Sequence, residues 1–170
     1  MSANKDRIPQ VGIVMGSDSD LPAMEAAAAM LKKFDITYEM TVASAHRSPE
    51  KAAAFASTAR ERGVRVIIAG AGHAAHLAGV LAAHTTLPVI GVPIDSSCLQ
   101  GLDALLATVQ MPPGIPVATM AIGKSGAKNA GIFAAQILGV SEEAIAGELR
   151  GFKKEMAEKV EEKAEKLKGL

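Results

Sequence analysis

A histidine and an arginine stand side by side at positions 46 and 47, in a segment that follows a predicted strand. An imidazole titrates near neutral pH and can both give and take a proton, whereas a guanidinium stays charged and binds anions such as phosphate. His46 is therefore a candidate for proton transfer and Arg47 for holding an anionic group. A lone histidine is more often structural than catalytic, but the strand-end position and the neighbouring cation favour a functional role.

Residues 15–20, MGSDSD, follow another apolar run and combine a glycine with two hydroxyls and two carboxylates. Backbone N–H groups at the start of a helix form a common phosphate site, which makes Ser17 a candidate ligand. A carboxylate repels phosphate, so we expect Asp20 either to bind ribose hydroxyls or simply to cap the helix. Together with His46 and Arg47, this turn suggests a phosphorylated, hydroxyl-bearing small molecule as the ligand.

Residues 70–79, GAGHAAHLAG, follow a third apolar run and match a G-x-G-x-x-A dinucleotide fingerprint. In a dinucleotide-binding domain the glycines follow the first strand, so we expect them here to let the backbone approach a small ligand. His73 and His76 have no cysteine or glutamate neighbours at metal-ligand spacing, and we expect no metal site. The GKS at 123–125 lacks the earlier glycine of an ATP-binding P-loop, because Ala118 stands at that position.

The composition is that of one ordinary domain of 170 residues, with 18 basic and 18 acidic side chains and a formal net charge of zero. This balance argues against nucleic-acid and membrane-surface partners. The single cysteine, Cys98, cannot form an internal disulfide, and the first residues hold no apolar leader, so we expect a cytoplasmic protein. No apolar run reaches the roughly 18 residues that span a bilayer.

Short β-branched runs alternate with Ala-rich segments, which predicts βαβ units around a buried parallel sheet, a three-layer αβα sandwich of the α/β class. The predicted strands are 11–15, 37–42, 66–69, 89–92 and 117–122. The predicted helices between and after them are 20–34, 48–62, 72–84, 98–108 and 126–138. Asp20 and Ser48 are expected to cap the first two. Ligands of such sheets gather at the carboxyl ends of the strands, where all the polar motifs fall.

Residues 141–168 differ from the rest, because they predict one long charged helix with Ser141 as its cap. Its apolar side chains recur at three- and four-residue spacing and form one stripe, namely Ile145, Leu149, Phe152, Met156, Val160 and Leu167. We expect residues 1–140 to form the catalytic domain and residues 141–170 an extra C-terminal helix for subunit packing. The loop 110–116, QMPPGIP, is a candidate for a cis bond or a lid.

A non-enzymatic nucleotide-binding or receiver-type signalling module is the alternative from another class. Asp18, Asp20 and Lys124 would suit a receiver, but its phospho-acceptor aspartate should end the third strand, where the chain reads AGAG at 69–72. A flavodoxin-like binding module is disfavoured because the chain has no tryptophan and one tyrosine to stack on a flavin.

Eight motifs in order give the chain a resemblance to the PurE family of de novo purine biosynthesis. They are MGSDSD, SAHRSP, IIAGAG, AAHL, PVIGVP, GLDALL, VQMP and AIGK, and the similarity covers residues 10–139. The resemblance implies a flavodoxin-like fold with a five-stranded parallel sheet, assembly as a homo-octamer, and no metal or organic cofactor. It also implies the family reaction, in which N5-carboxyaminoimidazole ribonucleotide becomes 4-carboxy-5-aminoimidazole ribonucleotide through decarboxylation and recarboxylation with trapped CO2.

The same resemblance implies roles for individual residues. The nucleotide is held by Ser17, Asp20 and Arg47, and the proton carrier is His46. The substrate pocket is expected to include Ser44, Gly72 and His76 as further substrate-binding residues.

Two positions depart from the usual family pattern, with His73 in place of glycine and Ala78 in place of proline. The extra imidazole puts in doubt that His46 is the only proton carrier near the pocket. The related carboxylase class, which uses free CO2, has Lys-Thr after the Ala-His pair. Arg47 and Ser48 therefore favour the mutase, and carboxylation with free CO2 remains the alternative.

Overall fold

Five parallel strands form the centre of the chain, in the order β2-β1-β3-β4-β5. They are β1 (Val11–Met15), β2 (Tyr38–Val42), β3 (Val66–Gly72), β4 (Val89–Ile94) and β5 (Ala118–Thr119). The computed structural model describes residues 7–168, so the expectation of no leader in residues 1–6 lies outside it. The predicted sheet is confirmed, and its strand order is that of a flavodoxin-like fold.

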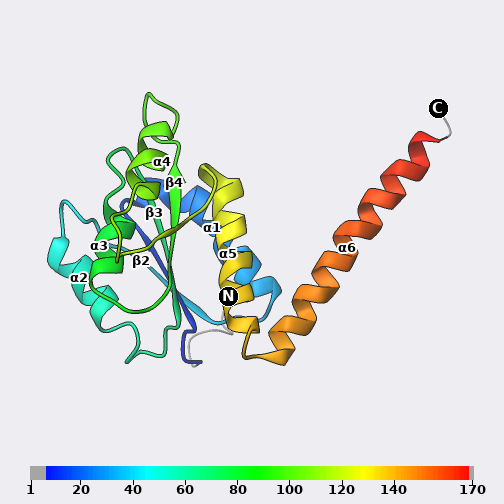
Figure 1. Ribbon diagram of the computed structural model, residues 1–170, viewed down its shortest axis with the longest axis horizontal. Coiled ribbons are helices and arrows are strands. Elements are labelled where there is room, and N and C mark those ends of the chain that lie inside the picture. The colour runs from blue at the N-terminus through cyan, green and yellow to red at the C-terminus, as the bar shows by residue number, and fades with distance from the viewer. Residues whose placement is uncertain (1–6, 169–170) are drawn as a thin grey trace.

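Helices cover both faces of this sheet (Figure 1). One face packs against α1 (Leu21–Lys33) and α5 (Gly123–Gly139), and the other against α2 (Pro49–Ser57) and α3 (Leu77–Ala83). Helix α4 (Leu102–Val109) packs against β4. Alternate side chains of each central strand enter the two cores, which explains why these strands are apolar throughout. The three-layer αβα sandwich is therefore confirmed.

Strand β3 extends three residues beyond its predicted end, and α3 begins five residues later than predicted. A Cβ on Gly70 would lie 2.4 Å from Met24 Sδ, and one on Gly72 would lie 1.9 Å from Ser96 Oγ. These glycines are needed inside the strand because other segments pack closely against it. The strand continues because it pairs with β4 as far as Gly72, which lies opposite Ile94, so the prediction of a helix from residue 72 is wrong and residues 73–76 form a loop instead.

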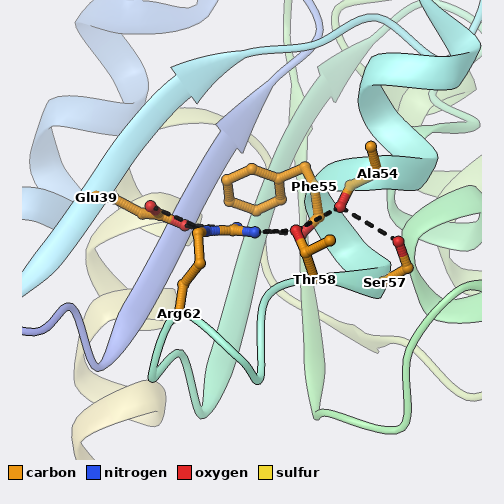
Figure 2. A network of polar contacts seen from close by, with 6 residues as sticks. All are labelled: Glu39, Ala54, Phe55, Ser57, Thr58 and Arg62. Atoms are coloured by element: carbon orange, nitrogen blue, oxygen red, sulfur yellow. Dashed lines mark hydrogen bonds and ion pairs between the residues drawn. The ribbon is translucent and has the colours of Figure 1, made fainter.

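Helix α2 ends five residues before its predicted end, at a network of polar contacts (Figure 2). Arg62 donates to the carbonyl of Phe55 at 3.1 Å and forms an ion pair with Glu39 at 2.7 Å. The Thr58 hydroxyl donates to the carbonyl of Ala54 at 2.7 Å. Arg62 thus supplies a donor to the Phe55 carbonyl, and the Thr58 hydroxyl adds a second donor to the Ala54 carbonyl, which also accepts the Thr58 N–H, so the last carbonyls of the helix are satisfied where it stops.

Strand β5 has two residues instead of the predicted six, because the chain soon leaves the sheet. Met120 still donates its N–H to the Gly91 carbonyl at 2.8 Å, and α5 begins at Gly123, which has a φ of 71°. No cis peptide bond occurs among residues 7–168, so the cis alternative for the loop 110–116 is wrong. Its role as a lid stays a prediction.

Helix α6 (Glu143–Leu167) begins two residues later than predicted, with Glu142 and not Ser141 at its N-cap. The Ser141 hydroxyl faces the end of α5, where it donates to the Leu138 carbonyl at 3.4 Å and accepts from Arg65 at 2.9 Å. The Glu142 carboxylate accepts from Gln10 and also pairs with Arg65. These contacts join the start of α6 to the amino-terminal edge of the sheet.

The apolar stripe of α6 divides into two halves. Ile145 is buried, and Leu149 and Phe152 pack against the core of α1 and α5, with the Phe152 ring edge-on to Phe34 at 5.5 Å. The expectation that all of this stripe faces another subunit is therefore wrong for its first half. Farther along, the exposed fractions are 44% for Met156, 62% for Val160 and 67% for Leu167. This distal half extends away from the domain (Figure 1). Within residues 7–168, no helix has the length and apolar character that a bilayer crossing requires.

Candidate active site

The turn after β1 is held by a reciprocal pair of hydrogen bonds. Ser17 accepts the Ser19 N–H through its hydroxyl at 3.3 Å, and its own N–H donates to the Asp20 carboxylate at 3.2 Å. This capping box forms a short 3-10 helix, η1 (Asp18–Asp20), directly before α1. Asp20 occupies the predicted N-cap position of α1, but its carboxylate binds back to Ser17 and makes no cap bond to α1.

The Asp20 side chain lies at the bottom of this turn, with 3% of its surface exposed. Burial raises the pKa of its carboxyl above the ordinary value, because a charge loses solvation inside the protein. Hydrogen bonds from the Ser17 N–H and the Ser19 hydroxyl oppose this rise in pKa. Protein donors therefore hold the carboxylate in place, and as a buried acceptor it suits ligand hydroxyls better than a phosphate.

The loop after β2 is organised by Ser44. Its hydroxyl accepts the backbone N–H groups of His46 at 3.3 Å and Arg47 at 3.1 Å. Ser48 occupies the predicted N-cap of α2, but its hydroxyl bonds to Ser44, accepting the N–H at 2.9 Å and donating to the carbonyl at 3.2 Å. These bonds fix the direction in which the His46 and Arg47 side chains leave the backbone. Within residues 7–168 the Arg47 guanidinium forms no ion pair.

His46 and His76 form a pair that the sequence does not predict. His46 Nε2 lies 2.8 Å from His76 Nδ1, and the two rings meet edge-on with their centroids 4.9 Å apart. One ring must donate and the other accept in this contact, so the tautomer of each depends on its partner. The arrangement can hold one proton between two rings and pass it on. The motif spacing gives no signal for this contact, because 30 residues separate the two histidines.

A hollow of about 460 Å³ joins these groups at the carboxyl ends of the strands. All seven predicted site residues line it, namely Ser17, Asp20, Ser44, His46, Arg47, Gly72 and His76. The volume falls in the range of small-molecule sites. The hollow lies at the ends of β1, β2 and β3, where the strand order reverses, as is usual for ligand sites in open parallel sheets.

Three further polar residues line the hollow, Ser19, His73 and Ser96. Ser96 follows β4, and its Oγ lies 3.2 Å from Nδ1 of the His73 ring. The signal that could have found Ser96 is its place in the polar run 95–97, which begins three residues after the end of the fourth predicted strand. Among residues 7–168, no group of three or more His, Cys, Asp or Glu side chains could hold a metal ion. The expectation of a metal-independent reaction stays a prediction.

Known proteins resemble this chain over nearly its whole length. The N5-carboxyaminoimidazole ribonucleotide mutase of Pyrococcus horikoshii is 57% identical over 166 residues, covering 98% of this chain and 93% of the relative. The mutase of the same name from Thermotoga maritima is 55% identical over 163 residues, covering 96% and 94%. The phosphoribosylaminoimidazole carboxylase of Schizosaccharomyces pombe is 54% identical over 159 residues, but only 28% of its length is covered.

The fold and a family model agree with these relatives. The crystal structure of Treponema denticola PurE matches with a TM-score of 0.85 at 30% identity, covering 94% of this chain and 99% of that one. A family model described as AIR carboxylase matches residues 10–159. The chain therefore belongs to the AIR carboxylase family.

Proposed function

We propose that this chain is an N5-carboxyaminoimidazole ribonucleotide mutase, an isomerase of de novo purine biosynthesis that needs no metal or organic cofactor. Two relatives with that name, at 57% and 55% identity, support the reading. The observation that carries the mechanism is the position of His46, paired with His76 and adjacent to Arg47 in the hollow. The single cysteine, Cys98, is exposed and free, which fits the proposed place in the cytoplasm.

The proposed reaction moves a carboxylate from nitrogen to carbon with His46 as the proton carrier. The N–C bond of the carbamate breaks, the nitrogen takes a proton from the His46 imidazolium, and CO2 and aminoimidazole ribonucleotide result. Carbon C4 of the ring then attacks CO2, and the C4 proton passes to His46. The proton given in the first step is recovered in the last, so one histidine performs both.

The residues around His46 are proposed to hold the ribonucleotide. Arg47 and the Ser17 hydroxyl bind the phosphate, since a guanidinium attracts an anion and a hydroxyl can donate a hydrogen bond to it. The buried Asp20 carboxylate accepts hydrogen bonds from ribose hydroxyls. Ser44 holds the loop that carries His46 and Arg47, and thereby contributes to the nucleotide site.

The released CO2 has to stay beside C4 for the transfer to be direct. We propose that Gly72 and His76 form the part of the hollow that retains it, which supplies a high effective concentration. The alternative is a carboxylase that takes free CO2 from solution. We retain this alternative because the Schizosaccharomyces pombe relative is named a carboxylase. The two functions differ in the source of the carboxylate.

Purified protein is expected to consume N5-carboxyaminoimidazole ribonucleotide without added bicarbonate. With ¹³C in the carbamate and unlabelled bicarbonate in solution, trapped CO2 predicts that the product keeps the label. The measurement is mass spectrometry of the product, with a sample lacking enzyme to correct for decay of the carbamate. Conversion of aminoimidazole ribonucleotide only with bicarbonate, or loss of the label, would favour the carboxylase.

We also propose that the protein assembles as a homo-octamer through α6 and α4. The distal half of the α6 stripe is exposed, and so is one face of α4 with its preceding turn, formed by Leu99, Leu102, Leu106 and Val109. Burying each large apolar side chain stabilises by about 1.5 to 3 kcal/mol, so two such surfaces favour association with other copies. Eight subunits is the number that the family resemblance implies.

Replacing Val160 with lysine is expected to give a smaller particle, because the new charge would be buried in the proposed subunit contact. Glu162→Lys places the same lysine on the opposite side of α6 and should leave the particle mass unchanged. Light scattering after size-exclusion chromatography measures both masses. An unchanged mass for Val160→Lys would contradict the role of the distal stripe.

A further inference from the structure

His73 has a backbone conformation that favours glycine. Its φ is 54°, in the left-handed region where a β-carbon is disfavoured. The chain is fixed there, because the preceding Gly72 packs against Ser96 and accepts the Ala75 N–H through its carbonyl at 3.2 Å. A strained residue at the edge of a ligand site calls for a functional explanation, since glycine would be easier to accommodate.

The His73 ring is positioned separately from the His46–His76 pair. Its Nδ1 lies 3.2 Å from Ser96 Oγ, which places the ring between the carboxyl ends of β3 and β4. Its Nε2 makes no hydrogen bond to any residue within 7–168. The residue lines the hollow, so this free nitrogen belongs to a side chain that a ligand can reach.

Charges from several elements act on His73. The carboxylates of Asp20 in η1 and Asp103 in α4 lie within electrostatic range of the ring, and both attract a positive charge there. Asp103 is held in place by the Ser97 hydroxyl at 2.8 Å. Arg47 and the rings of His46 and His76 also line the hollow and repel such a charge when they are charged. In the hollow itself, Arg47 and Asp20 carry opposite charges, so a positive charge on His73 would add to the attraction for an anionic ligand.

We propose that His73 is a second proton-accepting residue of the hollow, whose imidazolium form strengthens the binding of the anionic ribonucleotide. The proposal rests on the proposed function, since it takes the same ribonucleotide as the ligand. His46 acts on the transferred proton, whereas His73 acts through the charge of the site. The ligand phosphate itself takes up a proton near pH 6, whichever protein it binds, so the contribution of His73 is the difference in nucleotide affinity between the parent and a variant without the ring, and this difference should grow as the pH falls.

Calorimetric titration of the whole protein with 4-carboxy-5-aminoimidazole ribonucleotide tests this proposal in the parent and in His73→Asn. Asparagine tolerates the left-handed backbone and can bond to Ser96, but it does not titrate. When the pH is lowered from 8 to 5.5, the affinity of the parent should change by a factor about two to five times more favourable than that of the variant. This is the size of effect expected for one exposed charge pair. In buffers of different ionisation enthalpy, the variant should also take up fewer protons on binding.

Two other variants control for indirect effects. His84→Asn removes an exposed imidazole at the end of α3, outside the hollow, and should match the parent in proton uptake. His73→Gly removes both the ring and the backbone strain, so it should lose the extra affinity at low pH while its melting temperature rises by about 2 to 4 °C. Such a variant is more stable and yet binds less tightly, which misfolding cannot produce.

The possible failures are distinguishable. If the parent binds the ribonucleotide but His73→Asn keeps the same proton uptake and pH dependence, only the role of His73 is overturned. If the parent does not bind the ribonucleotide at any pH, the proposed function is overturned and the role of His73 with it.

Discussion

Replacing His46 with asparagine is expected to lower kcat by at least about a hundredfold while ribonucleotide affinity changes little, the usual effect of losing a general acid–base group. Asparagine has a similar shape and can keep a hydrogen bond to His76 Nδ1, but it cannot carry a proton. Steady-state kinetics gives kcat, and calorimetry with the product nucleotide gives the affinity. The comparison therefore separates the proton step from binding.

His84→Asn is the matched control, because it makes the same replacement at an exposed histidine outside the hollow. It should retain the parent's kcat. Near-normal turnover by His46→Asn would contradict the assignment. The role of proton carrier would then be assigned to His76, because its ring is in contact with His46. A double replacement of His46 and His76 would then be the decisive measurement.

The Arg47→Leu variant is expected to bind the ribonucleotide about ten- to a hundredfold more weakly, because a charge-assisted contact contributes about 1.5 to 3 kcal/mol. The guanidinium of Arg47 forms no ion pair within residues 7–168, so a ligand anion does not have to displace a protein carboxylate. Isothermal titration with the product nucleotide measures the loss. Arg47→Lys should recover part of it, since lysine restores the charge without the planar guanidinium.

The dephosphorylated riboside provides the test of which group Arg47 contacts. If the arginine holds the phosphate, the parent and Arg47→Leu should bind the riboside with the same affinity. Arg60→Leu removes a cation beside Thr86, away from the hollow, and should not alter nucleotide binding. A parent that binds riboside and ribonucleotide equally well would rule out a phosphate contact by Arg47.

Local sequence patterns determined the class of fold and the place of the site. Strand β1 has its predicted bounds, and all five strands occur in the predicted places, because short runs of β-branched and apolar residues fit a pleated sheet that is buried on both faces. Parallel strands bring their carboxyl ends to one edge, so motifs that follow three strands had to meet there. This is why the seven predicted site residues line one hollow.

Tertiary packing decided where several elements begin and end. Strand β3 extends to Gly72 because it keeps pairing with β4, and Met24 and Ser96, which are distant in the sequence, leave room only for glycine at positions 70 and 72. Glycine in a local pattern indicates a loop, so the pattern alone ended the strand too early. Helix α6 was also predicted, but only the contact of Phe152 with Phe34 shows that half of its stripe belongs to the domain's own core.

The residue types alone specify the chemistry available to the site, an imidazole and a guanidinium at positions 46 and 47 with hydroxyls and a carboxylate nearby. How those groups are coupled depends on the folded chain. It places His46 against His76, ties His73 to Ser96, and uses the Ser44 hydroxyl to hold the loop. The physical reason is that side-chain distances of about 3 Å depend on how strands and loops from remote parts of the chain pack together, which no local spacing specifies.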